Sequence, residues 1–194
     1  ILKLLPFSKS ELQSANMSKQ KVDDEIFTGF YPRIFDKKIP PTDFYPHYIQ
    51  TYIERDVRQL KQIGNMNKFI LFLKMCAGSI GQLLNLSSLA NECGIALSTA
   101  QSWISVLEAS YIVYLLKPDF NNYSKRLVKT PKLYFYDTGI ACSLLNIVNS
   151  EQITTHFMRG SLFENMVINE FIKKHLNACR EPQLTFWRDK RAMK

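Results

Sequence analysis

The spacing of apolar residues predicts that most of the chain is helical. From residue 44 to residue 63, apolar side chains return every three or four positions, as on one face of a helix. The same period predicts helices over about 66–76, 140–145 and 160–176. The expected apolar face of the last helix consists of Leu162, Phe163, Met166, Val167, Phe171 and Ile172.

The middle of the chain predicts two short helices joined by a tight turn. Asn85 or Ser87 is the expected cap of the first helix, and Gly94 is expected to end it. Ser98 and Gln101 have the spacing of a capping box, so we expect Ser98 to be the N-cap of the second helix. One face of that second helix carries Ala100, Trp103, Ile104 and Leu107.

A β-hairpin is expected directly after these helices. Residues 112–116 and 133–136 are strand-like runs, and the segment between them is polar and basic. Helix, tight turn, helix and hairpin, in this order, are typical of a winged helix.

The remaining segments complete a mainly α fold with short β-hairpins. Ser8 and Glu11 form a second capping-box pattern, which predicts a short helix near the start. Residues 27–46 hold four prolines and a cluster of aromatic residues, so an ordered but irregular connection is expected there. Residues 184–187 predict a strand.

Charge adds a functional indication to this pattern. The 194-residue chain has 25 Lys and Arg against 17 Asp and Glu, a formal net charge of +8. An excess of this size favours polyanions such as nucleic acid or an anionic membrane surface. The alternative is a basic protein without such a partner.

The cysteines and the hydropathy indicate a reducing, cytoplasmic setting. No two of the four cysteines are close enough in sequence to form a typical zinc site, so no metal is expected. Three of them lie in helical patterns beside apolar residues and are expected to be buried thiols; the four are Cys76, Cys93, Cys142 and Cys179. No apolar run approaches the roughly 20 residues of a membrane span, so no membrane partner is expected.

Several short strings, in this order, resemble one family. They are residues 4–8 (LLPFS), 11–12 (EL), 29–32 (GFYP), 52–57 (YIERDV), 125–139 (KRLVKTPKLYFYDTG), 160–165 (GSLFEN) and 186–189 (FWRD). They are similar to the uncharacterised C-terminal domain found on prokaryotic AAA-type P-loop ATPases, and the similarity covers nearly the whole chain. The resemblance implies a winged-helix domain flanked by helices and followed by the start of an α+β nuclease-like domain.

The resemblance also implies a division of the chain. Residues 1–26 would form the exit from a preceding ATPase domain, and residues 27–65 a helical linker or lid region. Residues 66–136 would form the winged helix, and residues 137–194 a truncated nuclease-like region. ATP and Mg²⁺ are then expected only in the longer parent protein. The partners would be its ATPase domain and, through that domain, further copies of the parent.

No catalysis is expected from this chain itself. It contains no G-x-x-x-x-G-K-[ST] string, whose glycines let backbone N–H groups bind phosphates. Gly29 and Pro32 resemble a lid motif that approaches the nucleotide in related ATPases; the alternative is a packed aromatic turn. Arg55 is a weaker candidate, as an arginine finger, because such residues are recognised only by their position relative to a phosphate.

DNA or RNA is the expected partner of the winged helix. The outward residues of its second helix include Thr99, Gln101 and Ser102, none of which is cationic. The cations lie on the hairpin instead, so phosphate contact without sequence reading is expected. These cations are Lys117, Lys125, Arg126, Lys129 and Lys132, against Asp119 alone. The alternative is a winged helix used for domain packing.

A nuclease-like metal site has two candidate residues. Glu164 matches a family position, and Asp189 follows the final strand. Metal-dependent phosphodiester cleavage needs clustered carboxylates, and the acidic-x-Asp string of the family is missing here. The alternative is that both are structural polar residues. His47, His156 and His175 are too scattered to predict a histidine-based site.

Overall fold

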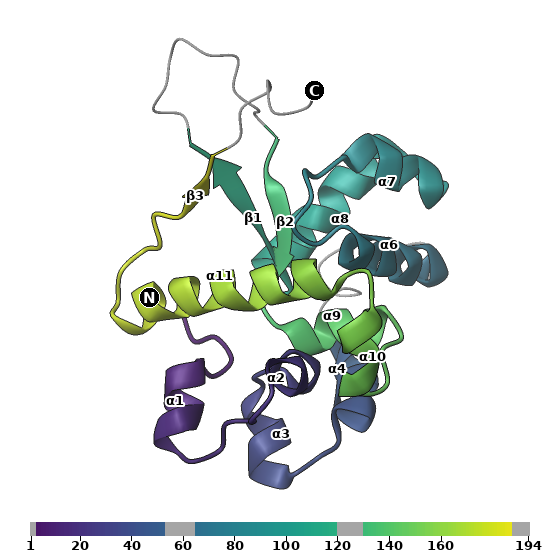
Figure 1. Cartoon of the computed structure of the whole chain (residues 1–194). Helices are drawn as coiled ribbons and strands as arrows, with labels where there is room; N and C mark the ends of the chain where they lie inside the picture. Colours follow the sequence, from purple (N-terminus) through teal and green to yellow (C-terminus); the bar gives the residue numbers. More distant parts are fainter. Residues whose placement is uncertain (1–2, 53–64, 120–129, 188–194) are drawn as a thin grey trace.

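Helices form most of the described part of the chain, and a small sheet lies at one end of them (Figure 1). The computed structural model describes residues 3–52, 65–119 and 130–187. The helices are α1 (Lys9–Ser14), α2 (Val22–Thr28), α3 (Pro32–Lys37), α4 (Pro41–Tyr52), α6 (Met66–Gly78), α7 (Leu86–Glu92), α8 (Leu97–Ala109), α9 (Thr138–Leu144), α10 (Ser150–Thr155) and α11 (Arg159–Asn177). The strands are β1 (Val113–Pro118), β2 (Lys132–Phe135) and β3 (Thr185–Phe186). The mainly α class with short β-structure is therefore confirmed.

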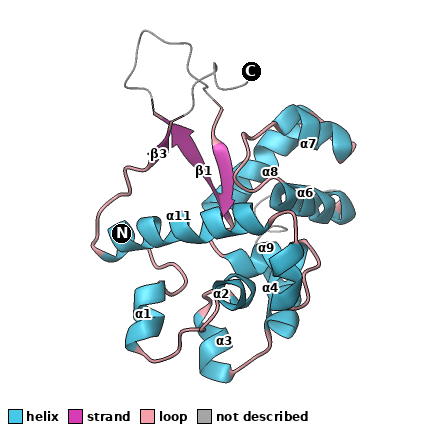
Figure 2. Ribbon diagram, viewed as in Figure 1, coloured by secondary structure: helices cyan, strands magenta, loops and turns pink. Residues whose placement is uncertain are grey.

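The sheet is built around the predicted hairpin (Figure 2). β1 and β2 are antiparallel, with Val113 opposite Phe135 and Leu116 opposite Lys132. Leu83 forms an isolated antiparallel bridge with Lys132, on the edge of β2 away from β1. β3 pairs in parallel with the end of β1.

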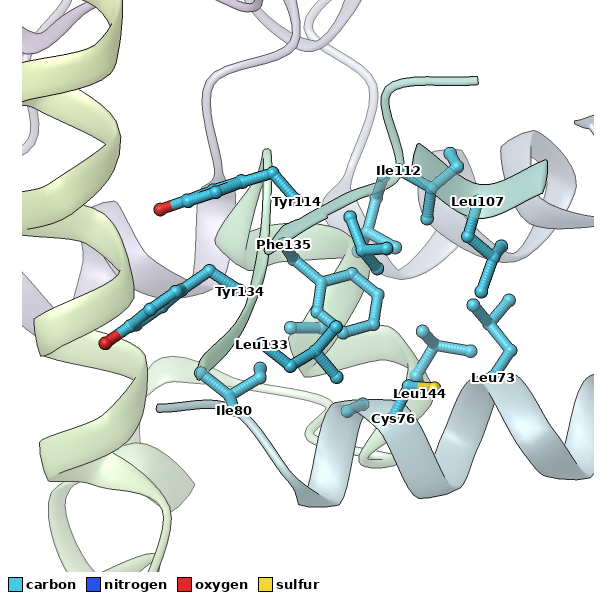
Figure 3. Close-up of a cluster of buried hydrophobic side chains, with 14 of the residues drawn as sticks. Leu73, Cys76, Ile80, Leu107, Ile112, Tyr114, Leu133, Tyr134, Phe135 and Leu144 are labelled. Atoms are coloured by element: carbon cyan, nitrogen blue, oxygen red, sulfur yellow. The ribbon is translucent and has the colours of Figure 1, made fainter. Parts of the chain in front are cut away.

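The core fills the space between α6, α8, α9 and the hairpin (Figure 3). The predicted inner face of α8 is confirmed, since its four residues are at most 5% exposed. Trp103 makes edge-to-face contacts with Phe69 and Phe72 of α6, at ring-centroid distances of 5.2 and 5.5 Å. Such pairs are the preferred geometry of buried aromatic rings.

Helix caps agree with the sequence at two of the three predicted positions. Ser8 and Glu11 form a reciprocal capping box, and Asn85 caps α7 through the backbone N–H of Ser88. The prediction for Ser98 is wrong. The N-cap of α8 is Ala96, whose side chain makes no capping hydrogen bond, and Ser98 lies inside the first turn.

The expectation of an irregular connection over residues 27–46 is also wrong. α2 extends into this region, and α3 and α4 begin within it at Pro32 and Pro41. Proline is well suited to the first helical position because the N–H it lacks has no helical partner there. The aromatic residues stabilise the short helices by packing together, with the Tyr31 and Tyr48 rings 4.8 Å apart.

The buried face of α11 differs from the predicted one. Phe163 and Phe171 are 46% and 51% exposed. The buried residues are Leu162, Asn165, Met166, Asn169, Ile172 and Lys173. The prediction from periodicity was wrong because periodicity locates a buried face from apolar residues alone. On this helix, polar side chains are also buried, because they form hydrogen bonds with backbone groups. In the part of the chain that the structure covers, no helix is long and apolar enough to cross a lipid bilayer.

Candidate nucleic-acid interface

The hairpin rests on α11 through side chains that bond its backbone. Asn165 accepts a hydrogen bond from the Phe135 N–H at 2.8 Å and donates one to the Phe135 carbonyl at 2.7 Å. Asn169 donates a second bond to the same carbonyl at 3.1 Å. The side-chain amide of Asn165 thus satisfies both backbone groups of Phe135, as the peptide groups of a neighbouring strand would do. These hydrogen bonds hold the hairpin against α11.

Stacked tyrosines lie between the two strands and α11. The Tyr114 and Tyr134 rings are 5.5 Å apart and nearly parallel. Figure 3 shows both hydroxyl groups directed toward α11, and Tyr134 donates its hydroxyl proton to Glu164. Burial and the Glu164 carboxylate both raise the pKa of Tyr134 well above its ordinary value. The neutral phenol is therefore the form that supports the hairpin.

Two of the predicted hairpin cations, Lys117 and Lys132, lie within the described residues. Lys117 is exposed near the end of β1, whereas Lys132 is half-buried at the start of β2. The Lys132 ammonium group is 3.0 Å from Glu164 Oε1 and 5.6 Å from the Phe186 ring centroid. Its side chain is only 21% exposed. Lys132 is thus engaged inside the protein, which makes it a weaker phosphate contact than its sequence position suggested. Lys125, Arg126 and Lys129 lie outside the described residues.

The predicted second helix presents a neutral surface beside the hairpin. Gln101 is exposed, while Thr99 and Ser102 are half-buried. Ser105 donates its hydroxyl proton to the Gln101 carbonyl at 2.9 Å, one turn back along α8. This surface offers amide and hydroxyl groups, and its first residue, Leu97, is 44% exposed.

The lid candidates lie in different surroundings. Pro32 is exposed at the first position of α3. Gly29 is buried, with φ +64° and ψ −163°, a region of backbone conformation that is essentially restricted to glycine. A Cβ at Gly29 would come within 1.9 Å of the Tyr45 hydroxyl and 2.4 Å of Asp137 Oδ1. The role that these contacts indicate for Gly29 is close packing.

Asp137 is the centre of a buried polar network. Its carboxyl group accepts hydrogen bonds from Tyr45, from the Phe30 N–H and from the Gly139 N–H, each at 2.8 Å. Burial raises the pKa of Asp137, although the charge of Lys173 and these hydrogen bonds oppose the change. The Tyr45 oxygen also lies 2.9 Å from the Thr28 carbonyl, and one hydroxyl proton cannot serve both acceptors. A proton on Asp137 would satisfy Tyr45 and leave Tyr45 free to donate to Thr28.

Lys173 joins this network to the first residues of the chain. Its ammonium group donates to the Phe7 carbonyl at 2.7 Å and lies 4.1 Å from the Phe30 ring centroid. Burial lowers the pKa of Lys173, while Glu170 and Asp137 oppose the change. The Phe7 N–H in turn donates to the Phe30 carbonyl at 2.9 Å. Residues near Phe7 are thereby held against α11 and the core.

The nuclease-like candidates are not brought into a carboxylate cluster. Glu164 bonds Lys132 and Tyr134, and Asp189 lies outside the described residues. Across residues 3–52, 65–119 and 130–187, no group of three His, Cys, Asp or Glu side chains is arranged to hold a metal ion. Of the cysteines, Cys76, Cys93 and Cys142 are buried free thiols as predicted, and Cys179 is exposed.

The outward face of α11 forms an apolar groove with α1 and the start of α2. Its volume is about 990 Å³. Its apolar lining includes Val22, Phe163, Met166, Val167 and Phe171, and Lys9 and Lys174 also line it. An exposed apolar surface of this kind is typical of a site that packs against another structure.

Comparison with known proteins places the chain in a family. Residues 19–151, more than half of the chain, match the family described as "Domain of unknown function (DUF8612)". The chain belongs to the DUF8612 family. The matched segment runs from just before α2 to the start of α10, so it includes the hairpin and Asp137.

Two mycobacterial proteins are similar to this DUF8612 chain. They are "Uncharacterized protein Mb2031c" of Mycobacterium bovis and "Uncharacterized protein Rv2008c" of Mycobacterium tuberculosis. Each is 31% identical over 142 residues, which cover 73% of this chain and 31% of the relative. The chain therefore spans about a third of the length of these relatives. No solved structure gives a significant match.

Several residues that organise this region could not be predicted, or could be predicted only in part, from the sequence. Asp137 precedes a predicted helix, and an aspartate there is a typical N-cap, so part of its role was visible in the pattern. Lys173 and Asn165 carried no such signal, because polar residues on a helix are usually solvated. Their roles depend on backbone groups of Phe7 and Phe135, which are far away in the sequence.

Proposed function

We propose that residues 66–136 are a winged-helix module of a longer AAA-type P-loop ATPase, and that this module contacts the phosphate backbone of nucleic acid. The observation that carries the proposal is the hairpin of β1 and β2. Its connection, residues 119–131, contains Lys125, Arg126 and Lys129 against the single acidic residue Asp119. Cations concentrated on one hairpin neutralise phosphates without reading sequence.

The order and pairing of the elements support the winged-helix part of the proposal. α6 is followed by the bridge at Leu83, then by α7, α8 and the hairpin. The residues next to Leu83 extend the pairing, since the Gly81 N–H donates to the Leu133 carbonyl and the Leu84 N–H to the Pro131 carbonyl. A short strand beside a wing strand, with the second helix leading into the hairpin, is the arrangement expected of a winged helix.

The surface of α8 supports contact without base reading. Arginine and lysine make the commonest specific contact, to guanine, and the outward face of α8 carries neither near Gln101. We therefore assign binding to the hairpin and a minor role to Thr99, Gln101 and Ser102. Gln101 retains the ability to read adenine through its amide.

The test is a binding titration with two unrelated duplexes of equal length at low salt. The proposal predicts equal affinities for the two, unchanged by Gln101→Ala. A strong preference for one duplex that is lost in Gln101→Ala would show that α8 reads bases. The absence of binding at low salt would reject nucleic-acid contact.

A second candidate function is domain packing, and the groove on α11 is the observation that favours it. We infer that this groove is covered by another part of the longer polypeptide, given that the mycobacterial relatives are more than twice as long as this chain. Replacing Phe163 and Phe171 by serine should leave the isolated chain folded and reduce its binding of a hydrophobic dye. Unfolding of that double variant would contradict a surface role. The same variant should keep its affinity for duplex DNA, which separates the two candidate functions.

A further inference from the structure

The chain is fastened to the core just before its first helix. Phe7 lies outside the helices and strands, yet both of its backbone groups are bonded. Its N–H donates to the Phe30 carbonyl at 2.9 Å, and its carbonyl accepts a hydrogen bond from the Lys173 ammonium group at 2.7 Å. Figure 1 shows the start of the chain at α11, from where it runs into α1. We call these two hydrogen bonds the Phe7 attachment.

The Phe7 attachment and the hairpin use the same face of α11. Asn165, Asn169 and Lys173 are spaced four residues apart, so they follow one another along one side of the helix. All three are at most 3% exposed. The two asparagines bond the backbone of Phe135 on β2, and Lys173 bonds the backbone of Phe7. A row of buried polar side chains therefore connects the start of the chain with the hairpin.

A second connection between the same two places runs through Phe30. Its carbonyl accepts the Phe7 N–H, and its own N–H donates to Asp137 at 2.8 Å. Asp137 comes two residues after Phe135, the last residue of β2. The Phe30 ring also lies under the Lys173 ammonium group, 4.1 Å from its centroid. Phe7 and the end of β2 are thus joined by two separate sets of contacts.

Departure of Phe7 would leave a buried charge short of an acceptor. Lys173 is 1% exposed, so water does not readily replace the Phe7 carbonyl. The acidic groups around it are Glu170, whose Oε1 is 3.5 Å from the ammonium nitrogen, and Asp137, whose charge acts on it. An ammonium group that turned toward Asp137 would compete with the Phe30 N–H for the same carboxyl group. Release of Phe7 therefore disturbs the contacts that follow β2.

We propose that the Phe7 attachment and the seating of the hairpin on α11 are energetically coupled, so that release of Phe7 loosens β2 and docking of Phe7 tightens it. This coupling does not depend on the proposed function, but its consequence does. In a longer ATPase whose hairpin contacts nucleic acid, a rearrangement of the segment that precedes Phe7 would alter the hairpin through these contacts.

The experiment is native-state hydrogen exchange, followed by NMR on the intact chain without nucleic acid. Lys173→Met removes the ammonium donor and keeps an unbranched side chain. Exchange of the Phe7 N–H should become faster in this variant. The Phe135 N–H should also exchange faster, by about 5- to 150-fold, the usual range for coupling between two sites. The backbone amides of α7 and α8 are the internal reference and should keep their rates. Lys174→Met, at the exposed neighbouring position, is the matched control and should change none of these rates.

A second variant tests the coupling from the other end. Asn165→Ala removes the side-chain partner of the Phe135 N–H and leaves Lys173 in place. Because coupling is reciprocal, the Phe7 N–H should exchange faster by a comparable factor, again relative to the amides of α7 and α8. This variant also decides the matter if Lys173→Met does not fold.

The exchange pattern separates the possible results. Faster exchange at both Phe7 and Phe135, with unchanged reference amides, supports the coupling. Faster exchange at Phe7 alone, or unchanged exchange at Phe7, overturns it. An equal acceleration of the reference amides overturns it as well, since Lys173 would then contribute only to global stability. If the coupling is observed but duplex DNA does not bind at low salt, the coupling stands and the proposed function fails.

Discussion

The side-chain amide of Asn165, on α11, bonds both the N–H and the carbonyl of Phe135, on β2. Both groups are buried, and Phe135 is the last residue of its strand. The carbonyl also accepts a hydrogen bond from the Asn169 amide, whereas Asn165 is the one side-chain partner of the N–H among the residues that the structure describes. These hydrogen bonds hold β2 of the hairpin against α11.

Asn165→Ala should therefore destabilise the fold in spite of the higher helix propensity of alanine. It leaves the buried Phe135 N–H without its partner, at a cost of about 1–3 kcal/mol, and also opens a small cavity. Urea unfolding measures the free energy of unfolding. Lys174→Ala, on the exposed side of the same helix, is the control and should change it by less than about 0.5 kcal/mol. Equal values for the two variants would contradict the assigned role of Asn165.

Two glycines should respond to alanine in opposite directions. Gly29→Ala forces a Cβ into the space of Tyr45 and Asp137 in a backbone conformation restricted to glycine, so it should cost at least about 3 kcal/mol. Gly160→Ala meets no atom within 4 Å and lies in α11, so it should stabilise the protein by up to about 1 kcal/mol. Thermal unfolding of the two variants provides the comparison. If Gly29→Ala left the thermal stability unchanged, the close-packing role of Gly29 would be contradicted, and a role in a nucleotide lid would again be the better explanation.

Asp137 should make stability depend on pH in a defined direction. Because burial raises its folded-state pKa above the ordinary value of 3.8, the folded protein keeps this proton where the unfolded chain has lost it. The resulting stabilisation is complete below 3.8 and is lost as the pH rises through the folded-state pKa.

The measurement is the difference in unfolding free energy between the wild type and Asp137→Asn, followed from about pH 3 to about pH 8. The advantage of the wild type should shrink as the pH rises. An advantage that grows instead would mean that the ionised carboxylate, held by Lys173 and its hydrogen bonds, is the favoured form.

Trp103→Ala should be among the more damaging substitutions in the helical part of the module. The indole is buried between Phe69 and Phe72, and loss of such an aromatic residue costs about 3–5 kcal/mol. Leu97→Ala, at the exposed start of the same helix, should cost less than about 1 kcal/mol. Chemical denaturation followed by far-ultraviolet circular dichroism can compare the pair. A nearly neutral Trp103→Ala would show that α8 does not depend on this packing.

The sequence predicted those features that depend on neighbouring residues. Periodicity located the buried face of α8 and the two strands of the hairpin, because local spacing determines which side chains share a face. It failed for α11, where Asn165 and Lys173 are buried to bond the backbone of Phe135 and Phe7. The capping-box prediction for Ser98 was also wrong, because the spacing of two side chains does not determine at which residue the preceding turn ends and the helix begins. The ion pair between Lys132 and Glu164 could not be predicted from the sequence, because it joins residues of two elements, β2 and α11, that are far apart in the chain.

The salt dependence of duplex binding, compared between the wild type and a double variant with Lys125→Ala and Arg126→Ala, tests the central claim most directly. Each phosphate contact contributes about 0.9 to the slope of log affinity against log salt. The account predicts weaker binding of the double variant to all sequences alike and a slope reduced by up to about 2. An unchanged slope and affinity in the double variant would contradict the claim that the hairpin of this module contacts nucleic-acid phosphates.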